Sequence, residues 1–176
     1  MNPSARIRIG YLLFLFIASA CSKPAQNEPS SNTQSPAPQR ITSESVVKVS
    51  AQPVAIARGE SGDAVVRLTI QSGYHTNANP PTFPYLIATQ LDITAGDGIS
   101  VAFVSYPNAL TKEFAFADKP LAVYEGETEL RAKLKADSSA SKGEHSIAAQ
   151  LRVQACDHQV CYPPGQIGLR IPVTVK

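Results

Sequence analysis

Residues 146–155, with the sequence SIAAQLRVQA, alternate apolar and polar side chains towards their end and lead directly into Cys156. The same period returns at the C-terminus, where residues 167–175 (IGLRIPVTV) carry apolar side chains at every second position. A period of two over eight or more residues is typical of a half-buried strand in an antiparallel sheet. The C-terminal part of the chain therefore predicts β-structure.

Similar short runs occur from about residue 46 onward, and clusters of Gly, Pro, Asn and Asp separate them. Turn residues at such spacing mark strand ends, and no run has the 3.6-residue period of a helix. The pattern predicts an all-β fold, an immunoglobulin-like antiparallel β-sandwich that follows an N-terminal signal segment and a disordered tether. Pro172 has no N–H to donate, so we expect the last strand to lie at a sheet edge or to contain a bulge. The expected strands are 46–49, 64–70, 86–93, 99–104, 121–124, 129–134, 146–155 and 167–175.

The first 20 residues have the pattern of a secretory signal peptide. Arg6 and Arg8 precede an apolar run over residues 9–20. This run is shorter than the roughly 20 residues that a bilayer-spanning helix needs, and it ends in small residues. We expect export from the cytoplasm.

The sequence ASAC at residues 18–21 resembles a bacterial lipobox, which predicts that Cys21 becomes the lipidated first residue of the mature protein. Ser22 in the next position favours the outer membrane by the sorting rule for such lipoproteins. The alternative is ordinary secretion with cleavage after Ala20, which leaves Cys21 as a free thiol. Under the first interpretation the protein is periplasmic and lipid-anchored.

Residues 22–40 are rich in Pro, Ser, Gln and Asn and contain no large aliphatic or aromatic side chain. Such a segment cannot bury enough apolar surface to offset the entropy of ordering it, so we expect a flexible tether. The expected organisation is a lipoprotein signal peptide (1–20), a lipid-anchored linker (21–45) and one folded domain (46–176). A net charge of +2 without a basic patch argues against binding to nucleic acid.

Two thiols, Cys156 and Cys161, lie near the end of the domain with four residues between them. In an exported protein such a pair suggests a disulfide, and opposed positions at a hairpin mouth are close enough to form one. Closing so short a loop constrains the unfolded chain by only about 2 kcal/mol, which makes the bond a weak staple. A redox role and a purely structural role both remain open on spacing alone.

The loop between the cysteines contains Asp157 and His158, which could tune a thiolate in opposite senses. The alternative is that both are solvated turn residues. Cys156, His158 and Cys161 could also supply three metal ligands, but an oxidising compartment favours the disulfide over a metal site. We expect no metal and no cofactor.

These features together make the chain similar to the N-terminal periplasmic domain of the thiol:disulfide interchange protein DsbD. The strongest similarity is VQAC at 153–156 followed by CYPP at 161–164. GYHTNANPP at 73–81, continuing as PYLI at 84–87, resembles stand-alone members of the family, and KEF at 112–114 resembles the start of its cap loop. The resemblance covers residues 46–175.

The resemblance implies roles for individual residues. Cys161 would be the thiol that enters mixed disulfides with a partner, and Cys156 would resolve them. Phe114 would be a hydrophobic lid over the pair, with a core aromatic residue as the alternative, and Tyr162 and His158 would support the site. Tyr74 and His75 are expected to pack or hydrogen-bond rather than to catalyse. The loop between the cysteines is one residue shorter than in the best-known family member.

The function expected from the family is periplasmic thiol–disulfide interchange. Electrons would pass through the Cys156–Cys161 pair from a membrane electron donor to thioredoxin-like or disulfide-isomerase proteins. The sequence contains neither the multi-span membrane domain nor the thioredoxin-like domain of the full family protein, so a separate reductant is expected. The alternative is a non-catalytic, disulfide-stapled lipoprotein domain that binds a protein through its loops.

Overall fold

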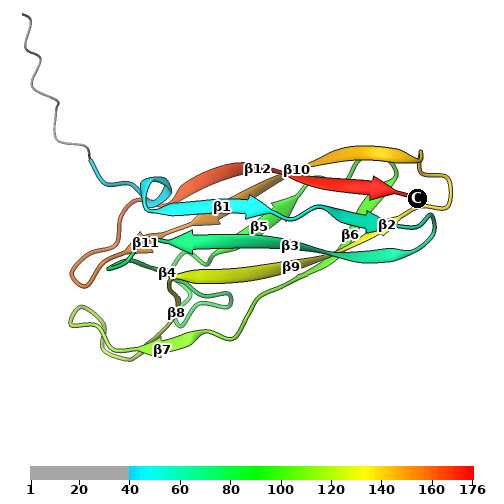
Figure 1. Ribbon diagram of the computed structural model, residues 1–176. Helices are drawn as coiled ribbons and strands as arrows, with labels where there is room; N and C mark the ends of the chain where they lie inside the picture. Colours follow the sequence, from blue (N-terminus) through cyan, green and yellow to red (C-terminus); the bar gives the residue numbers. More distant parts are fainter. Residues whose placement is uncertain (1–39) are drawn as a thin grey trace, which may run out of the picture. The chain divides into compact units, whose positions relative to one another are not determined.

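The computed structural model describes residues 40–176, and this part of the chain is almost entirely β (Figure 1). Its only helical element is one 3-10 turn, η1 (Ser43–Ser45), and no helix there is long and apolar enough to cross a membrane. The strands are β1 (Val47–Ala51), β2 (Val54–Ile56), β3 (Ser61–Ile70), β4 (His75–Asn77), β5 (Gln90–Ile93), β6 (Ile99–Ser105), β7 (Leu110–Lys112), β8 (Leu121–Tyr124), β9 (Glu127–Ala136), β10 (Gly143–Val153), β11 (Ala155–Cys156) and β12 (Gly165–Val175).

The strands form three four-stranded sheets. Sheet A has the order β1-β3-β9-β6, sheet B the order β2-β12-β10-β5, and sheet C the order β11-β4-β8-β7. All pairings are antiparallel except that of β2 with β12. Sheets A and B enclose one apolar core, to which strands of both contribute. The expected all-β, immunoglobulin-like sandwich is confirmed.

The alternation in the sequence matches the burial in the structure. Every second side chain of β9 is buried, and β10 and β12 behave in the same way over most of their length. Leu130, Leu134 and Leu151 are fully buried, and burial of each contributes about 1.5–3 kcal/mol of transfer free energy. The apolar positions of the period-two pattern are therefore the residues that face the core of the sandwich.

Sheet C lies at the end of the sandwich away from the C-terminus (Figure 1). The single strand expected over 146–155 is wrong, because β10 ends at Val153 in sheet B and β11 begins at Ala155 in sheet C. Between them, Gln154 Nε2 donates to the Tyr162 carbonyl at 3.3 Å, and its Oε1 accepts from Asn77 Nδ2 at 3.3 Å. These bonds hold the chain where it leaves one sheet for the other.

The strand expected over 86–93 is also partly wrong, because only β5 (Gln90–Ile93) is a strand. Leu86 lies in the preceding loop and packs against a small second apolar cluster at sheet C. Apolar residues in this loop cover sheet C instead of forming a ladder. The strands β2, β4 and β7 have three residues each, which is too short to show a period in the sequence.

Pro172 does not mark an edge strand. β12 lies inside sheet B between β2 and β10, and its register with β10 runs without a bulge. Pairing with β2 begins only at Val173, so the side of β12 that faces β2 is free at Pro172. The missing N–H is tolerated because the strand is locally an edge at that residue.

A two-residue turn joins sheet C to sheet A. Glu125 and Gly126 connect β8 to β9, and Gly126 has a φ of 59°, a conformation that glycine adopts without steric cost. The Gly126 carbonyl accepts a hydrogen bond from the Ile70 N–H at 2.8 Å. The turn thereby places the Glu125 carboxylate beside sheet C.

Candidate redox site

Cys156 and Cys161 form a disulfide across the mouth of a four-residue loop. Their Cα atoms are 3.9 Å apart. They are a bridge pair that exchanges no hydrogen bonds, flanked by Asp157 N–H to Val160 O at 2.9 Å and Tyr162 N–H to Ala155 O at 2.8 Å. In antiparallel ladders such pairs have the shorter Cα separation.

The two sulfur-bearing residues differ in exposure. Cys156 is completely buried in sheet C, whereas Cys161 is partly exposed. A molecule approaching from solvent therefore meets the Cys161 side of the bond first.

The Asp157 carboxylate organises the loop between the cysteines. Its Oδ1 accepts hydrogen bonds from the N–H groups of Gln159 at 2.7 Å and Val160 at 2.9 Å, and its Oδ2 accepts from the Tyr162 hydroxyl at 2.6 Å. The bond from Tyr162, followed by the two backbone donors, lowers the pKa of Asp157 to about 2. The same carboxylate raises the pKa of the Tyr162 hydroxyl to about 12. Asp157 therefore holds a negative charge in the loop between the two cysteines.

His75 lies directly opposite Cys156 in the pairing of β4 with β11. Opposed residues of an antiparallel pair project from the same face of a sheet, so the imidazole and the Cys156 side chain share one face. His75 is only 2% exposed, and its Nε2 is buried without a hydrogen-bond partner among the described residues. Burial lowers the pKa of His75 to about 4, so the imidazole is neutral at pH 7.

Phe114 covers this face from the loop between β7 and β8. It is buried, and its ring stacks on the His75 ring at a centroid distance of 4.1 Å. It also stacks on Phe116 at 5.3 Å and lies 6.3 Å from the His158 ring. Phe114 belongs to the small apolar cluster of sheet C and not to the main core.

An apolar groove of about 380 Å³ adjoins Cys161. Tyr85 and Val160 on its rim are 73% and 51% exposed, and Phe116 is also exposed. The residues that line the groove are Tyr85, Leu86, Phe116, Ala117, Leu121, Gln159, Val160 and Cys161.

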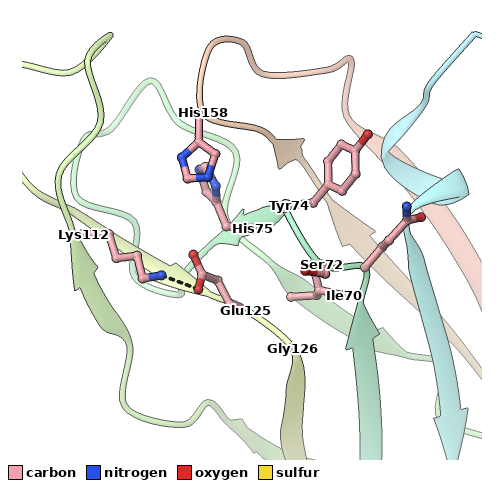
Figure 2. Close-up of a pocket in the computed structure, with 10 residues that line it drawn as sticks. Ile70, Ser72, Tyr74, His75, Lys112, Glu125, Gly126 and His158 are labelled. Atoms are coloured by element: carbon pink, nitrogen blue, oxygen red, sulfur yellow. Dashed lines mark hydrogen bonds and ion pairs between the residues drawn. The ribbon is translucent and has the colours of Figure 1, made fainter.

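A second, polar pocket of about 360 Å³ includes His75 and His158 (Figure 2). Lys112 and Glu125 form an ion pair at 2.5 Å on its wall. Tyr74, the residue before β4, also lines the pocket. Tyr74 packs against Tyr162 at a centroid distance of 6.0 Å. As expected, Tyr74 and His75 pack within the site.

The segment before β1 also supports the site, which the sequence did not reveal. Ser43 is buried, its hydroxyl donates to the Pro163 carbonyl at 2.6 Å, and its Oγ accepts from the Ala155 N–H at 2.9 Å. Ser43 thus connects β11, before the cysteine loop, with the segment that follows Cys161. The sequence had placed Ser43 in the linker of residues 21–45, because the neighbouring residues are mostly polar.

Five of the six site residues expected from the sequence lie together at this end of the domain: Phe114, Cys156, His158, Cys161 and Tyr162. The sixth, Cys21, lies outside the described residues. The signal peptide and most of the expected linker also fall outside them. Within residues 40–176, no group of three or more His, Cys, Asp or Glu side chains could hold a metal ion.

A family model described as the N-terminal part of the thiol:disulfide interchange protein DsbD matches residues 42–167, which include every residue of the site described above. The chain belongs to the DsbD N-terminal family. Membership in the DsbD N-terminal family connects the Cys156–Cys161 disulfide with thiol–disulfide interchange. The matched range also begins upstream of Ser43, in agreement with the packing of η1.

Two solved structures are among those to which this chain is similar. The N-terminal domain of Neisseria meningitidis DsbD in its reduced form has 20% identity and a TM-score of 0.43, over 63% of this chain and 77% of that chain. The N-terminal periplasmic domain of ScsB from Proteus mirabilis has 17% identity and a TM-score of 0.52, over 72% of this chain and 46% of that chain. The chain thus spans less than half of the ScsB structure, and the likeness is one of fold. No curated protein matches the sequence.

Proposed function

We propose that this protein is a periplasmic thiol–disulfide interchange module that relays electrons between a membrane reductase and thioredoxin-like or disulfide-isomerase proteins. The Cys156–Cys161 pair carries the electrons. The main support is the asymmetry of the disulfide, with Cys156 buried and Cys161 partly exposed beside an apolar groove. A purely structural bond needs no such access from solvent.

The exchange needs only thiol chemistry. The Cys161 thiolate attacks a disulfide sulfur of the partner, which forms a mixed disulfide and releases the other partner sulfur as a thiolate. The Cys156 thiolate then attacks the Cys161 sulfur and releases the second partner thiolate. The partner gains two electrons and, on protonation, two protons, while the Cys156–Cys161 disulfide is regenerated. A reductase returns the pair to the dithiol by the reverse steps.

The groove beside Cys161 is the surface on which a partner would dock. Large exposed apolar side chains gathered at one place mark protein contacts, and Tyr85, Phe116 and Val160 gather there. In this proposal Phe114 is the lid that shields the disulfide until the partner displaces the loop. Its position in the small cluster of sheet C, outside the main core, supports that role.

A trapping experiment tests the relay. In a Cys156→Ser variant the mixed disulfide at Cys161 has no resolving thiol, so covalent adducts with periplasmic proteins should accumulate in cells. A Cys161→Ser variant is the matched control and should trap far less, because Cys156 is buried. Absence of adducts, together with a wild-type pair that stays oxidised in cells, would reject the proposal.

The second candidate is a binding domain in which the disulfide is only a staple, and the complete burial of Cys156 favours it. The reduction potential distinguishes the two, because structural disulfides usually lie below about −300 mV and exchange-active ones lie higher. A double Cys156→Ala/Cys161→Ala variant should lose function under the first proposal and keep it under the second.

We also propose that residues 1–20 are a lipoprotein signal peptide, that Cys21 is lipidated, and that the linker after Cys21 tethers the domain to the outer membrane. The lipobox-like sequence at residues 18–21 supports this arrangement. Radiolabelled fatty acid should enter the wild-type protein, whereas a Cys21→Ser variant should remain unlabelled. Equal labelling of both would contradict lipidation at Cys21.

A further inference from the structure

His75, whose Nε2 is buried without a hydrogen-bond partner among the described residues, pairs across β4 and β11 with Cys156, whose sulfur differs in chemical state between the disulfide and the dithiol. In the disulfide, the Cys156 sulfur has no proton to donate and no charge to attract a donor. In the dithiol it is a thiol or a thiolate, either of which can bond to an imidazole. The pairing of β4 with β11 places both side chains on one face of sheet C, and Phe114 covers that face. A buried polar atom that lacks a partner in one redox state is therefore positioned to gain one in the other.

The surroundings of His75 decide which kind of bond it can make. Lys112 comes from β7 and Glu125 from the turn after β8, and the two form an ion pair. His158 and Asp157 face the ring from the loop between the cysteines. Burial keeps the imidazole neutral at pH 7, so it offers one N–H donor without adding a buried positive charge.

We propose that His75 is the hydrogen-bond partner of the Cys156 sulfur in the reduced protein, and that its N–H stabilises the Cys156 thiolate that resolves mixed disulfides at Cys161. This inference rests on the proposed function and assigns a residue to its second step. No proton moves to or from His75. Cys156 loses its proton to water, its thiolate attacks the Cys161 sulfur, and the departing partner thiolate takes up a proton. The negative charge of Asp157 opposes thiolate formation at this site, which makes a nearby donor consequential.

Stopped-flow reaction of the reduced chain with 5,5′-dithiobis(2-nitrobenzoate) separates the two steps. A Cys21→Ser background leaves only the site cysteines to report. Attack by Cys161 releases the first thionitrobenzoate at a rate that depends on reagent concentration. Attack by Cys156 on the mixed disulfide releases the second thionitrobenzoate at a rate that is independent of reagent concentration. The pH profile of the second phase gives the pKa of Cys156.

A His75→Phe variant keeps an aromatic ring against Phe114 and removes the N–H. It should raise the pKa of Cys156 by about one unit and slow the second phase about tenfold at pH 7, since a hydrogen bond to a charged group is worth about that much. His75→Gln restores a donor and should bring the second phase back to within about threefold of wild type. A wild-type pKa and second phase in His75→Phe would overturn the proposal.

A measurement on the wild-type chain keeps the proposal testable if His75→Phe does not fold. The ¹⁵N resonances of the His75 ring should shift between the oxidised and the reduced protein, because a new N–H···S bond forms. Unchanged ring resonances would overturn the inference. Neither experiment uses a protein partner, so a failed trapping experiment rejects the relay, while a failed His75 experiment rejects only this assignment.

Discussion

The carboxylate of Asp157 shows how one side chain shapes the site. It accepts two backbone hydrogen bonds within its own loop and a third from the Tyr162 hydroxyl, which lies beyond Cys161. The loop is therefore closed twice, by the Cys156–Cys161 disulfide and by the hydrogen bond from the Tyr162 hydroxyl to the Asp157 carboxylate. Because the acceptor is ionised, these bonds weaken when Asp157 is protonated.

The first prediction concerns the titration of Asp157. Its carboxyl carbon, followed by NMR, should titrate with a midpoint of about 2, against the ordinary 3.8. The folded pKa is depressed, so the stabilisation is present above pH 3.8 and is lost as the pH falls towards 2. Tyr162→Phe removes the hydroxyl whose hydrogen bond contributes most to the lowered pKa of Asp157, and it should move the midpoint upward. An unchanged midpoint in that variant would show that the backbone donors suffice.

The second prediction concerns stability and His75. Its folded pKa of about 4 lies below the ordinary 6.5, so between these pH values the unfolded chain binds a proton that the folded chain does not. The contribution of His75 is complete above pH 6.5 and declines as the pH falls to 4. Urea unfolding at pH 7 and pH 4.5 should show a smaller difference in His75→Phe than in wild type. The same change in the free energy of unfolding between pH 7 and pH 4.5 in both proteins would contradict this prediction.

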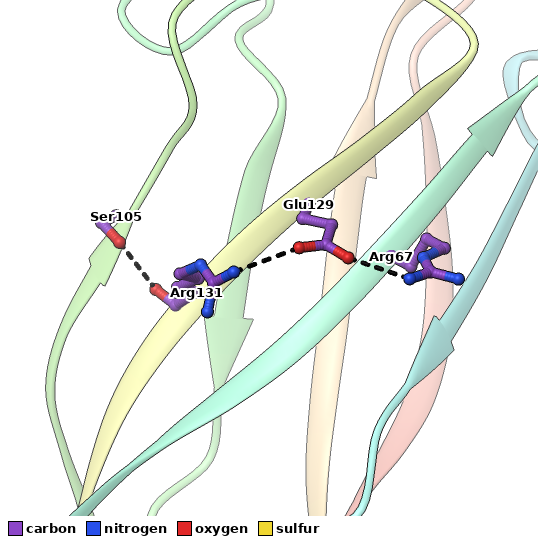
Figure 3. Close-up of polar contacts among 4 residues, drawn as sticks. All are labelled: Arg67, Ser105, Glu129 and Arg131. Atoms are coloured by element: carbon purple, nitrogen blue, oxygen red, sulfur yellow. Dashed lines mark hydrogen bonds and ion pairs between the residues drawn. The ribbon is translucent and has the colours of Figure 1, made fainter.

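At the scale of elements, the buried faces of the strands in sheets A and B hold the domain together, whereas the loop between β7 and β8 covers the site. Phe114 projects from the loop between β7 and β8 onto His75 of β4. The outer face of sheet A is different in kind. There Glu129 accepts hydrogen bonds from Arg67 at 2.9 Å and Arg131 at 3.2 Å, and the Arg131 carbonyl accepts from Ser105 (Figure 3).

The third prediction tests the loop. Phe114→Ala removes a buried ring and should cost about 3 kcal/mol of folding free energy. It should also speed reduction of the Cys156–Cys161 disulfide by dithiothreitol, because the covering ring is gone. Phe103→Ala is the matched control: this ring is 56% exposed on edge strand β6, and its loss should change stability by less than about 0.5 kcal/mol. Equal reduction rates in both variants would contradict a covering role.

The fourth prediction compares the two faces of β9. Glu129→Gln breaks both ion pairs on the outer face, but their side chains are more than one-third exposed, so the loss should be about 0–1 kcal/mol and smaller at high salt. Leu130→Ala, one residue further on the inner face, should cost about 2–5 kcal/mol. Urea unfolding at low and high salt measures both. A larger loss of stability in Glu129→Gln than in Leu130→Ala would mean that the ion pairs on the outer face contribute more to the free energy of unfolding than the buried side chain does.

At the scale of the whole domain, the core and the disulfide are largely separate. Sheets A and B enclose the main core, whereas the disulfide belongs to sheet C and the loop that follows β11. The redox cycle that we propose would therefore leave the packing of sheets A and B unchanged. Such independence suits a module that is oxidised and reduced repeatedly.

The fifth prediction follows from that separation. Reduction of the Cys156–Cys161 bond should lower the free energy of unfolding by about 2 kcal/mol, the value for a loop of about six residues. Urea unfolding of the oxidised and the reduced Cys21→Ser chain measures the difference. The reduced chain should keep its far-ultraviolet circular dichroism. Unfolding on reduction would show that the bond is a structural staple.

Much of the sandwich could be predicted because burial on one face of a strand leaves a period of two in the sequence. This holds for the long strands β9, β10 and β12, whereas β8 was found at the expected residues 121–124 as a short apolar run. The strands β2, β4 and β7 could not be predicted, because three residues carry no period. Gln154 could not be identified as the point where the chain changes sheets, because the alternation continues through it.

Half-buried strands, and two thiols near enough along the chain to bond, could be inferred from the amino-acid sequence alone. Both are local properties, set by side-chain polarity and by spacing. The folded chain was needed to show that Cys156 is buried while Cys161 is partly exposed, that His75 lies opposite Cys156, and that Ser43 hydrogen-bonds to both sides of the cysteine loop. These depend on pairing between segments far apart in sequence, such as residues 75 and 156, and register between distant strands leaves no trace in either segment alone.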